Sequence, residues 1–484
     1  MRLLLAAVSV LALTACTTAA PAAPDMPIAP SFPSGDPGAG EAEFRALYKE
    51  LVETNTAFSV GSCTLASERM KKRLLAAGYP ERDLHILVDP APNRPQDGNL
   101  VAILPGSDAT KKPILLMAHI DVVEAKREDW VRDPFVLTEE GGYFYARGAS
   151  DDKSMAAIFT DSMVRYKQEG YKPARTIKMM LNCGEESANG FIGAKYMVDN
   201  HLDLVSAEFA LNEGAGGRID AATGRYLFNG VQAGEKLYQD FTIEVTNPGG
   251  HSSRPTPDNA IYELGQALMK VQSYEFPIEF NDATRTFFRR MGAITPGQEG
   301  QDMRDAADGE SMAAIRRLMV NPSYNATLRT TCIATQLSAG HAPNALPQRA
   351  TANVNCRIFP GHTQEEIREQ LDDAIKNTDV KVTLRSPPET PMKAPPLPPE
   401  ILGPIEQLTE KMWPGIPVIP AMATGATDGR FTTPAGIPTY GVSGIFADPN
   451  TTNAHGLNER VGVKQLLEGR MFLYQLVKMY AGGE

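Results

Sequence analysis

The chain has 484 residues, of which 42% are hydrophobic and 22% are charged, and its formal net charge is −11. This length is enough for two or three domains with a sizeable buried core. The acidic balance excludes nucleic acid as the main partner, because phosphate binding needs a basic surface.

The first sixteen residues, MRLLLAAVSVLALTAC, are typical of a secretion signal. Arg2 precedes an apolar run from Leu3 to Leu13, which is too short to span a membrane as a finished helix. The run ends in LTAC, which resembles a bacterial lipobox and implies cleavage before Cys16 and lipidation of that cysteine. A plain signal peptide with an incidental cysteine is the alternative. Residue 17 is threonine rather than aspartate, so we expect a lipid-anchored protein of the bacterial periplasm, held at the outer membrane.

Residues 17–40 are rich in Ala, Pro, Gly and Ser and are predicted to form a linker, because they cannot bury a core. No later segment is a candidate for a membrane span, so we expect membrane contact through the lipid anchor only. The cysteines that remain, Cys63, Cys183, Cys332 and Cys356, lack the short spacing of a zinc-binding pair. An oxidising compartment permits disulfides. Cys332 and Cys356 lie on two predicted strands, so a bridge between them is allowed.

After the linker, strand and helix patterns alternate. Apolar residues from Glu41 to Val52 recur at helical spacing, as do those from Met155 to Tyr166. Short apolar runs bounded by Gly, Pro or charged residues are typical of buried strands, and they occur at residues 100–105, 113–119, 176–182 and 207–214. This alternation predicts an α/β domain with a largely parallel sheet.

From about Leu237 the pattern changes to strands with one buried face. The predicted strands lie near residues 241–245, 327–337, 350–359 and 380–386, and the predicted helices lie near residues 261–271 and 363–377. Their order, β-α-β-β-α-β, is that of a ferredoxin-like unit, with extra helix-prone material at residues 273–325. We therefore predict an α/β domain built from residues 41–235 and 391–484, interrupted by an α+β domain at residues 236–390.

Acidic and histidine residues follow the predicted strands of the α/β domain. Any one of them is more simply explained as a helix cap or a solvated charge, but together they lie at the sheet edge where open α/β sheets bind ligands. The residues are His119, Asp121, Asp151, Asp152, Glu185, Glu186, Glu213 and His455. Oxygen and imidazole ligands without thiolates suit Zn²⁺, Mn²⁺ or Co²⁺. A divalent ion would also make the adjacent Glu185 and Glu186 tolerable, provided that only one of them binds it.

Five motifs, in this order, carry a family resemblance: HID, GASDDKS, GEES, PGGHSSRP and HGLNERV. The chain resembles the co-catalytic zinc metallopeptidases that include glutamate carboxypeptidase, aminoacylase, carnosine dipeptidase and yeast vacuolar carboxypeptidase. The resemblance covers nearly all of residues 41–484. It implies a zinc-exopeptidase-like, mostly parallel sheet flanked by helices, with an inserted ferredoxin-like α+β domain that acts as a lid and dimerisation domain.

The resemblance also implies a role for each residue at the site. It implies two Zn²⁺ per subunit, with Co²⁺ or Mn²⁺ as alternatives. The implied metal ligands are His119 and Glu213 for one ion, Glu186 and His455 for the other, and Asp151 as the bridge. Asp121 would orient His119, and Glu185 would act as the general base and acid. A cis peptide between Asp151 and Asp152 is expected as well.

In the lid, the resemblance implies that His251 stabilises the oxyanion, often in the site of a partner subunit. Asn344 and Arg357 would hold the free carboxylate of the substrate, a task that suits the planar fork of arginine. A homodimer through the lid is therefore expected. Asp428 and Arg430, in ATDGRF, match another loop of the family without a definite role.

These features predict a metallo-exopeptidase that cleaves dipeptides or short peptides with a free C-terminal carboxylate. An aminoacylase that hydrolyses N-acyl amino acids is the alternative with the same chemistry. A non-catalytic peptide-binding lipoprotein is the alternative from another class, and the presence of Glu185 argues against it.

Overall fold

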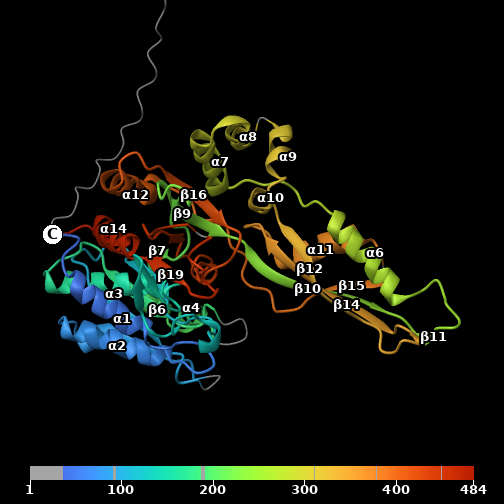
Figure 1. Cartoon of the computed structure of the whole chain (residues 1–484), viewed down its shortest axis with the longest axis horizontal. Coiled ribbons are helices and arrows are strands. Elements are labelled where there is room, and N and C mark those ends of the chain that lie inside the picture. The colour runs from blue at the N-terminus through green and yellow to red at the C-terminus, as the bar shows by residue number, and fades with distance from the viewer. Residues whose placement is uncertain are drawn as a thin grey trace, which may run out of the picture.

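The computed structural model describes residues 36–90, 94–186, 191–309, 311–377, 379–448 and 450–483. The predicted secretion signal, Cys16 and most of the predicted linker lie outside these residues. Figure 1 shows a large sheet with helices on its faces and, beside it, a smaller sheet that carries α6 and α11. Within the described part of the chain, no helix combines the length and apolar character needed to cross a bilayer.

The large sheet is mixed, and its central strands are parallel. Its strands, in spatial order, are β1 (Leu84–Leu87), β2 (Asn99–Leu104), β6 (Ile177–Asn182), β3 (Ile114–His119), β7 (Phe209–Asn212), β17 (Thr439–Gly441), β9 (Tyr226–Glu235), β8 (Gly217–Ile219) and β18 (Phe446–Ala447), with β16 (Val418–Ala423) paired to β9. The predicted α/β class is confirmed, with antiparallel pairs β1–β2, β2–β6, β17–β9 and β8–β9 added around the parallel centre.

Both faces of this sheet are covered, which explains the unbroken apolar runs of its central strands. Successive residues of β3 alternate between two cores: Leu116 and Ala118 face the first, and Leu115 and Met117 face the second. The first core is built with α1 (Glu41–Val52), α2 (Cys63–Ala76), α3 (Lys153–Gln168), α12 (Pro399–Met412) and α14 (Val463–Ala481). The second is built with α4 (Gly193–Asn200) and α5 (Leu202–Val205), beside α13 (Gly429–Thr432).

Shorter elements complete this domain. Strands β4 (Thr138–Glu140), β5 (Tyr143–Tyr145) and β19 (Arg460–Gly462) form a separate small sheet. Two 3₁₀ turns are η1 (Glu81–Asp83) and η2 (Arg127–Asp129). The β5–β19 pairing matters for the site, because it brings the segment after His455 next to the turn that carries Asp151.

The smaller sheet is antiparallel and has the predicted ferredoxin-like order. Its elements along the chain are β10 (Leu237–Thr246), α6 (Ala260–Ser273), β12 (Thr331–Ala339), β14 (Arg349–Ile358), α11 (Gln364–Ile375) and β15 (Val380–Leu384), and the spatial order is β12-β14-β10-β15. A short two-stranded antiparallel ribbon pairs β11 (Gly250–His251) with β13 (Ala345–Leu346). The strand predicted from residue 327 begins at Thr331 instead, because Leu328 ends a helix and is fully buried.

The extra segment between α6 and β12 is helical, as predicted. It comprises α7 (Asp282–Ile294), α8 (Gly297–Asp308), α9 (Met312–Leu318) and α10 (Pro322–Leu328), with a small core of its own around Phe288. Of these helices, α7 packs on the large sheet beside β16 (Figure 1). Arg290 Nη1 donates to Val418 O at 2.8 Å and pairs with Glu406 at 2.7 Å. The insertion is therefore attached to the domain that carries the metal-type residues, although it interrupts the lid in sequence.

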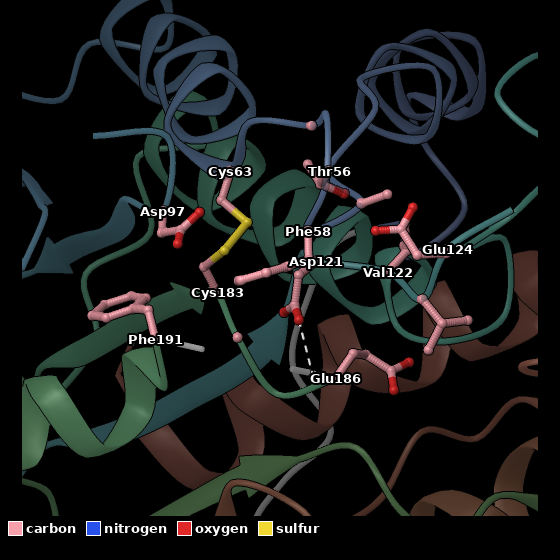
Figure 2. A pocket seen from close by; sticks show the side chains of 14 residues that line it. Thr56, Phe58, Cys63, Asp97, Asp121, Val122, Glu124, Cys183, Glu186 and Phe191 are labelled. Atoms are coloured by element: carbon pink, nitrogen blue, oxygen red, sulfur yellow. Dashed lines mark hydrogen bonds between the residues drawn. A yellow bond between two sulfur atoms is a disulfide. The ribbon is translucent and has the colours of Figure 1, made fainter. Parts of the chain in front are cut away.

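Two disulfides link elements that are distant in sequence. Cys332–Cys356 joins β12 to β14, the bridge that the predicted strands allow. Cys63–Cys183, which was not predicted, joins the first residue of α2 to the segment after β6 (Figure 2). Because Cys183 lies two residues before Glu185, the second disulfide anchors the base of the GEES segment to α2.

A buried ion pair holds the last helix against the body. Arg470 Nε on α14 lies 2.8 Å from Asp161 Oδ2 on α3, and both side chains are almost fully buried. The other guanidinium nitrogens of Arg470 donate to Gly38 O at 3.2 Å and Ala39 O at 2.6 Å. One arginine thus connects two helices and the end of the predicted linker.

We expect Asp161→Asn to lower the free energy of unfolding by about 3–5 kcal/mol, because it leaves the charge of Arg470 buried without its partner. Urea unfolding followed by circular dichroism measures this change. Asp308→Asn removes one partner of an exposed pair with Arg289 and is the matched control, with an expected change below about 1 kcal/mol. Equal effects of the two substitutions would contradict the structural role of the buried pair.

Candidate metal centre

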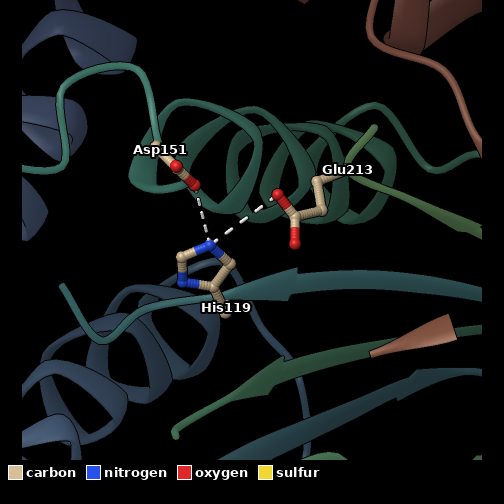
Figure 3. Close-up of side chains that lie close together, drawn as sticks. All are labelled: His119, Asp151 and Glu213. Atoms are coloured by element: carbon tan, nitrogen blue, oxygen red, sulfur yellow. Dashed lines mark hydrogen bonds and ion pairs between the residues drawn. The ribbon is translucent and has the colours of Figure 1, made fainter. Parts of the chain in front are cut away.

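The carboxyl ends of three parallel strands bring the acidic and histidine residues together. His119 is the last residue of β3, Glu185 and Glu186 follow β6, and Glu213 follows β7. Since β6, β3 and β7 are neighbours in the sheet, these residues meet at one edge. Asp151 reaches the same place from the turn before α3, and Figure 3 shows it facing His119 together with Glu213.

The carboxylate of Asp151 lies between two histidines. Its Oδ1 is 3.0 Å from His119 Nε2, and its Oδ2 is 3.2 Å from His455 Nε2. Each histidine has a further carboxylate beside it: Glu213 Oε2 lies 3.8 Å from His119 Nε2, and Glu186 Oε1 lies 2.9 Å from His455 Nε2. The result is two half-sites that share Asp151.

These donors fit divalent metal ions. In each of the groups His119–Asp151–Glu213 and Asp151–Glu186–His455, the candidate ligand atoms lie within 4.8 Å of one another. The donors are carboxylate oxygens and imidazole nitrogens, the set that zinc, cobalt and manganese sites use. The structure thus brings together all five predicted ligands.

Asp121 supports both sides of this arrangement. His119 Nδ1 lies 3.1 Å from Asp121 O and 3.6 Å from Asp121 Oδ1, which fixes the ring so that Nε2 faces Asp151. The Asp121 carboxylate also accepts hydrogen bonds from the backbone N–H groups of Glu185, at 3.3 Å, and Glu186, at 3.0 Å. Asp121 therefore orients a candidate ligand and positions the adjacent glutamates.

Glu459 is a further positioning residue, and the sequence analysis did not identify it. Its buried carboxylate accepts hydrogen bonds from Arg147 Nη1 at 2.7 Å and from three backbone N–H groups of one turn, those of Gly148, Ser150 and Asp151, at 2.8–3.0 Å. The expected cis peptide between Asp151 and the next residue is present in this turn. The signal in the sequence was the acidic residue of HGLNERV, four positions after the histidine.

The loop that carries His455 has an unusual backbone. Asn453, His455 and Asn458 have φ angles of 54–60°, the left-handed region that side chains other than Gly, Asn and Asp seldom adopt. Such strained residues persist where the surroundings fix them, and they gather at functional sites. Here the left-handed backbone conformation of His455 places its side chain beside Asp151 and Glu186.

Glu185, Asp152 and Glu213 hold protons more tightly than isolated carboxylates do, whereas hydrogen bonds from His119 and His455 lower the pKa of Asp151 against the effect of burial. Burial raises the pKa of Glu185 to about 8, and neighbouring carboxylates add to the rise. Burial also raises the pKa of Asp152 and Glu213 well above the usual range. Carboxylates in turn raise the pKa of His119 against the effect of burial, and hydrogen bonds to two carboxylates raise that of His455 to about 10. Metal binding at this centre would therefore release protons.

The lid residues lie apart from this centre. His251 on β11 and Asn344, just before β13, are exposed at the end of the lid that is remote from β6 (Figure 1). Ser253 N donates to His251 Nδ1 at 3.1 Å, and Ser252 N donates to Asn344 O at 3.0 Å. Within one chain, neither residue reaches the metal-type residues.

Arg357 lies at the other end of the lid, where β10 begins and β14 ends, next to the large sheet. Its guanidinium group is 4.8 Å from the centre of the Tyr238 ring, and burial lowers its pKa, with Tyr238 and the nearby Arg430 also acting on it. Arg430 belongs to the loop of Asp428, whose buried carboxylate accepts a hydrogen bond from Asn182 at the end of β6. Arg357 is thus the predicted substrate-binding residue that faces the metal domain of its own chain.

Residues 115–479 match the model of Peptidase family M20/M25/M40. The chain belongs to this family. The predicted resemblance is confirmed, and so is the prediction of an enzyme: the chain is an M20-family metallo-hydrolase with candidate His, Asp and Glu ligands for a dinuclear site.

Relatives within the family differ in their substrates. N-fatty-acyl-amino acid synthase/hydrolase PM20D1 of Xenopus tropicalis is 29% identical over 380 residues, which are 77% of this chain and 73% of that protein. Aminoacylase-1B of Rattus norvegicus is 28% identical over 397 residues, 79% of this chain and 84% of that protein. The M20-family metallo-carboxypeptidase Sso-CP2 of Sulfolobus solfataricus has the same fold, with a TM-score of 0.67 at 18% identity over 91% of this chain and 99% of that one.

We expect Glu459→Gln to weaken zinc binding about 10- to 100-fold, the usual effect of losing a group that positions ligands. The amide nitrogen of Gln would face N–H donors of the Asp151 turn instead of accepting from them. Competition with a chelating dye measures the dissociation constant. Glu128→Gln, on an exposed 3₁₀ turn, is the control, and an unchanged constant in Glu459→Gln would refute the positioning role.

A pH effect is expected at Glu235, whose side chain is buried beside the Asp428 loop. Thr427 N donates to its carboxylate at 2.8 Å, yet burial raises its pKa to about 8. The folded state then binds more protons than the unfolded state between about pH 4.5 and 8, so this residue lowers stability as the pH rises through that window. In the wild type the free energy of unfolding should fall by up to about 1.4 kcal/mol per pH unit because of this residue, and Glu235→Gln should abolish that fall. Urea unfolding of both proteins from pH 5 to 8 tests it, and parallel pH profiles would disprove it.

Proposed function

We propose that this protein hydrolyses the amide bond between an acyl group and an amino acid whose carboxylate is free. The class includes N-acyl amino acids, dipeptides and short peptides. The observation that supports the proposal most directly is the position of Asp151, shared between two histidine–glutamate pairs with a further glutamate, Glu185, next to them. The relatives named as N-fatty-acyl-amino acid synthase/hydrolase and aminoacylase favour the N-acyl members of the class.

In this proposal two Zn²⁺, with Co²⁺ or Mn²⁺ as alternatives, are held at the two half-sites. His119 and Glu213 would hold one ion, Glu186 and His455 the other, and Asp151 both. Bound ions supply Lewis acidity for the scissile carbonyl and lower the pKa of the attacking water. Arg357 would bind the carboxylate of the amino-acid half by its bidentate fork.

Glu185 is the proposed general base and acid. It belongs to a third group of candidate donors with His119 and Glu186, but the His119 Nε2 atom already faces Asp151 and Glu213. Its own side chain makes no hydrogen bond or ion pair with the described residues. Glu185 would take a proton from the attacking water and deliver it to the leaving nitrogen, while Asp121 holds its backbone in place.

The lid would complete the site in a homodimer. Strand β12 lies at the edge of the lid sheet and exposes Ile333 and Leu337, and exposed apolar edges are typical of surfaces that pair with another chain. Such pairing would let His251 and Asn344 enter the site of the partner subunit, where His251 would stabilise the oxyanion. We propose this homodimer together with a lipid anchor at Cys16 and a location in the periplasm.

The decisive experiment compares a dipeptide mixture with matching N-acyl amino acids, each with and without a chelator, by mass spectrometry of the products. We expect chelator-sensitive cleavage that zinc restores. Glu185→Gln should lower kcat by about 10²–10⁴-fold with unchanged zinc content, whereas Glu128→Gln should not change kcat. If zinc-loaded protein cleaves neither set but binds either one, the chain is a binding lipoprotein and the proposal is wrong.

A further inference from the structure

A cavity of about 420 Å³ adjoins the metal centre and is not used by the proposed chemistry. Asp151 and Glu213 line one part of it. Much of its remaining wall is apolar and comes from five separate parts of the chain, with Met155, Phe228, Phe287, Ile419 and Ile445 among the lining residues. Its size lies within the range of pockets for small-molecule ligands. Part of a substrate bound at the metal centre would therefore enter an apolar enclosure.

Small residues keep this space open directly beside a metal ligand. Glu213 is followed by Gly-Ala-Gly-Gly at residues 214–217, and all four line the cavity. Side chains are excluded there by close packing: a Cβ at Gly217 would lie 2.2 Å from the ring of Phe446, and one at Gly230 would lie 2.8 Å from Gly216 O. The segment consequently presents backbone rather than bulk to the cavity.

The basic residues near the metal centre decide which half of the substrate faces the cavity. The loop of Asp428 and Arg430 is hydrogen-bonded to Asn182 at the end of β6 and, through Thr427, to Asn212 at the end of β7, with Arg357 of the lid close by. The free carboxylate of the amino-acid half would lie at these arginines, and neither of them lines the cavity. The amino-acid half therefore lies toward this loop, and the acyl half is left for the cavity.

The charge on the cavity wall argues against a free amino group in the acyl half. Apart from the carboxylates at the metal centre, the charged residue among the described lining residues is Arg218. Its side chain is half-buried and makes no hydrogen bond or ion pair with the part of the chain that the structure describes; burial lowers its pKa, and Asp448 acts in the opposite direction. A cation in this position repels the ammonium group of a peptide and leaves a neutral acyl chain unaffected.

Phe287 is the wall residue that comes from the inserted helices. It lies on α7, which packs on β16, and its ring is 5.3 Å from that of Phe288 in the core of the insertion. We infer that this cavity is the acyl pocket of the enzyme, that Phe287 limits the length of an unbranched apolar acyl chain, and that Arg218 selects against substrates with a free α-amino group. The inference rests on the proposed amide hydrolysis and names its substrate class.

The test measures kcat/KM for N-acyl derivatives of one amino acid, from acetyl to palmitoyl, and for a dipeptide with the same C-terminal residue. For the wild type we expect a rise of about four-fold for each added methylene group up to a limiting chain length. Phe287→Ala should move that limit by about three methylene groups, because it opens the wall toward α7. Arg218→Met should raise the ratio of dipeptide to N-acyl kcat/KM about ten-fold.

Phe280→Ala is the matched control, because Phe280 packs on Phe288 in the same insertion but does not line the cavity. Its chain-length limit should equal that of the wild type. Phe287→Leu gives a smaller change if Phe287→Ala fails to fold. The inference is overturned if both Phe287 variants keep the wild-type limit, or if the wild type prefers the dipeptide. Loss of all chelator-sensitive hydrolysis in the wild type would instead refute the proposed function itself.

Discussion

The structure depends on one carboxylate, that of Asp151, being held between two histidines. The acidic side chains of Glu185, Glu186 and Glu213 lie around the same point and repel Asp151. The turn that carries Asp151 must therefore be held in position by other contacts. Glu459 fixes it through four hydrogen bonds from the turn and from Arg147. Because Glu459 and His455 belong to the same loop, a single buried carboxylate sets both the shared ligand and one of the histidines that it serves. N–H donors to Glu459 and Asp121 therefore hold the acidic side chains close to one another, although their charges repel.

In the proposed reaction, recognition of the two halves of a substrate is divided between two parts of the molecule. The lid carries Arg357 and, at its far end, His251 and Asn344, on a sheet that is separate from the metal domain. The inserted helices belong to the lid in sequence but are bonded to the metal domain through Arg290. A movement of the lid would therefore change how the amino-acid carboxylate is held, while the wall that contains Phe287 would stay in register with the metal ligands.

Much of this fold is predictable from local patterns. The central strands are buried on both faces, so β2, β3, β6 and β7 stand out as apolar runs, and the alternation in the lid gives its strand order. The candidate ligands are found because each follows a strand and because five motifs recur in a known order. Glu459, the Cys63–Cys183 bridge and the packing of α7 were not found, since each depends on a contact between segments far apart in sequence, with about 310 residues between Glu459 and its partners. The motif HGLNERV contains Glu459, but no local signal reports which distant segment its side chain contacts.

The adjacent glutamates show why proximity in sequence is useful at this centre. Both backbone N–H groups point to the carboxylate of Asp121, so the peptide unit between the two glutamates is held in place. Glu186 is directed to His455, and Glu185 is left without a partner among the described residues. One peptide bond thus ties a proposed base to a proposed metal ligand, and the base keeps its place relative to the metal centre without any ligand bond of its own. The two glutamates are tolerated side by side because burial raises the pKa of Glu185 to about 8, so that it carries little charge at neutral pH, and because His455 pairs with Glu186.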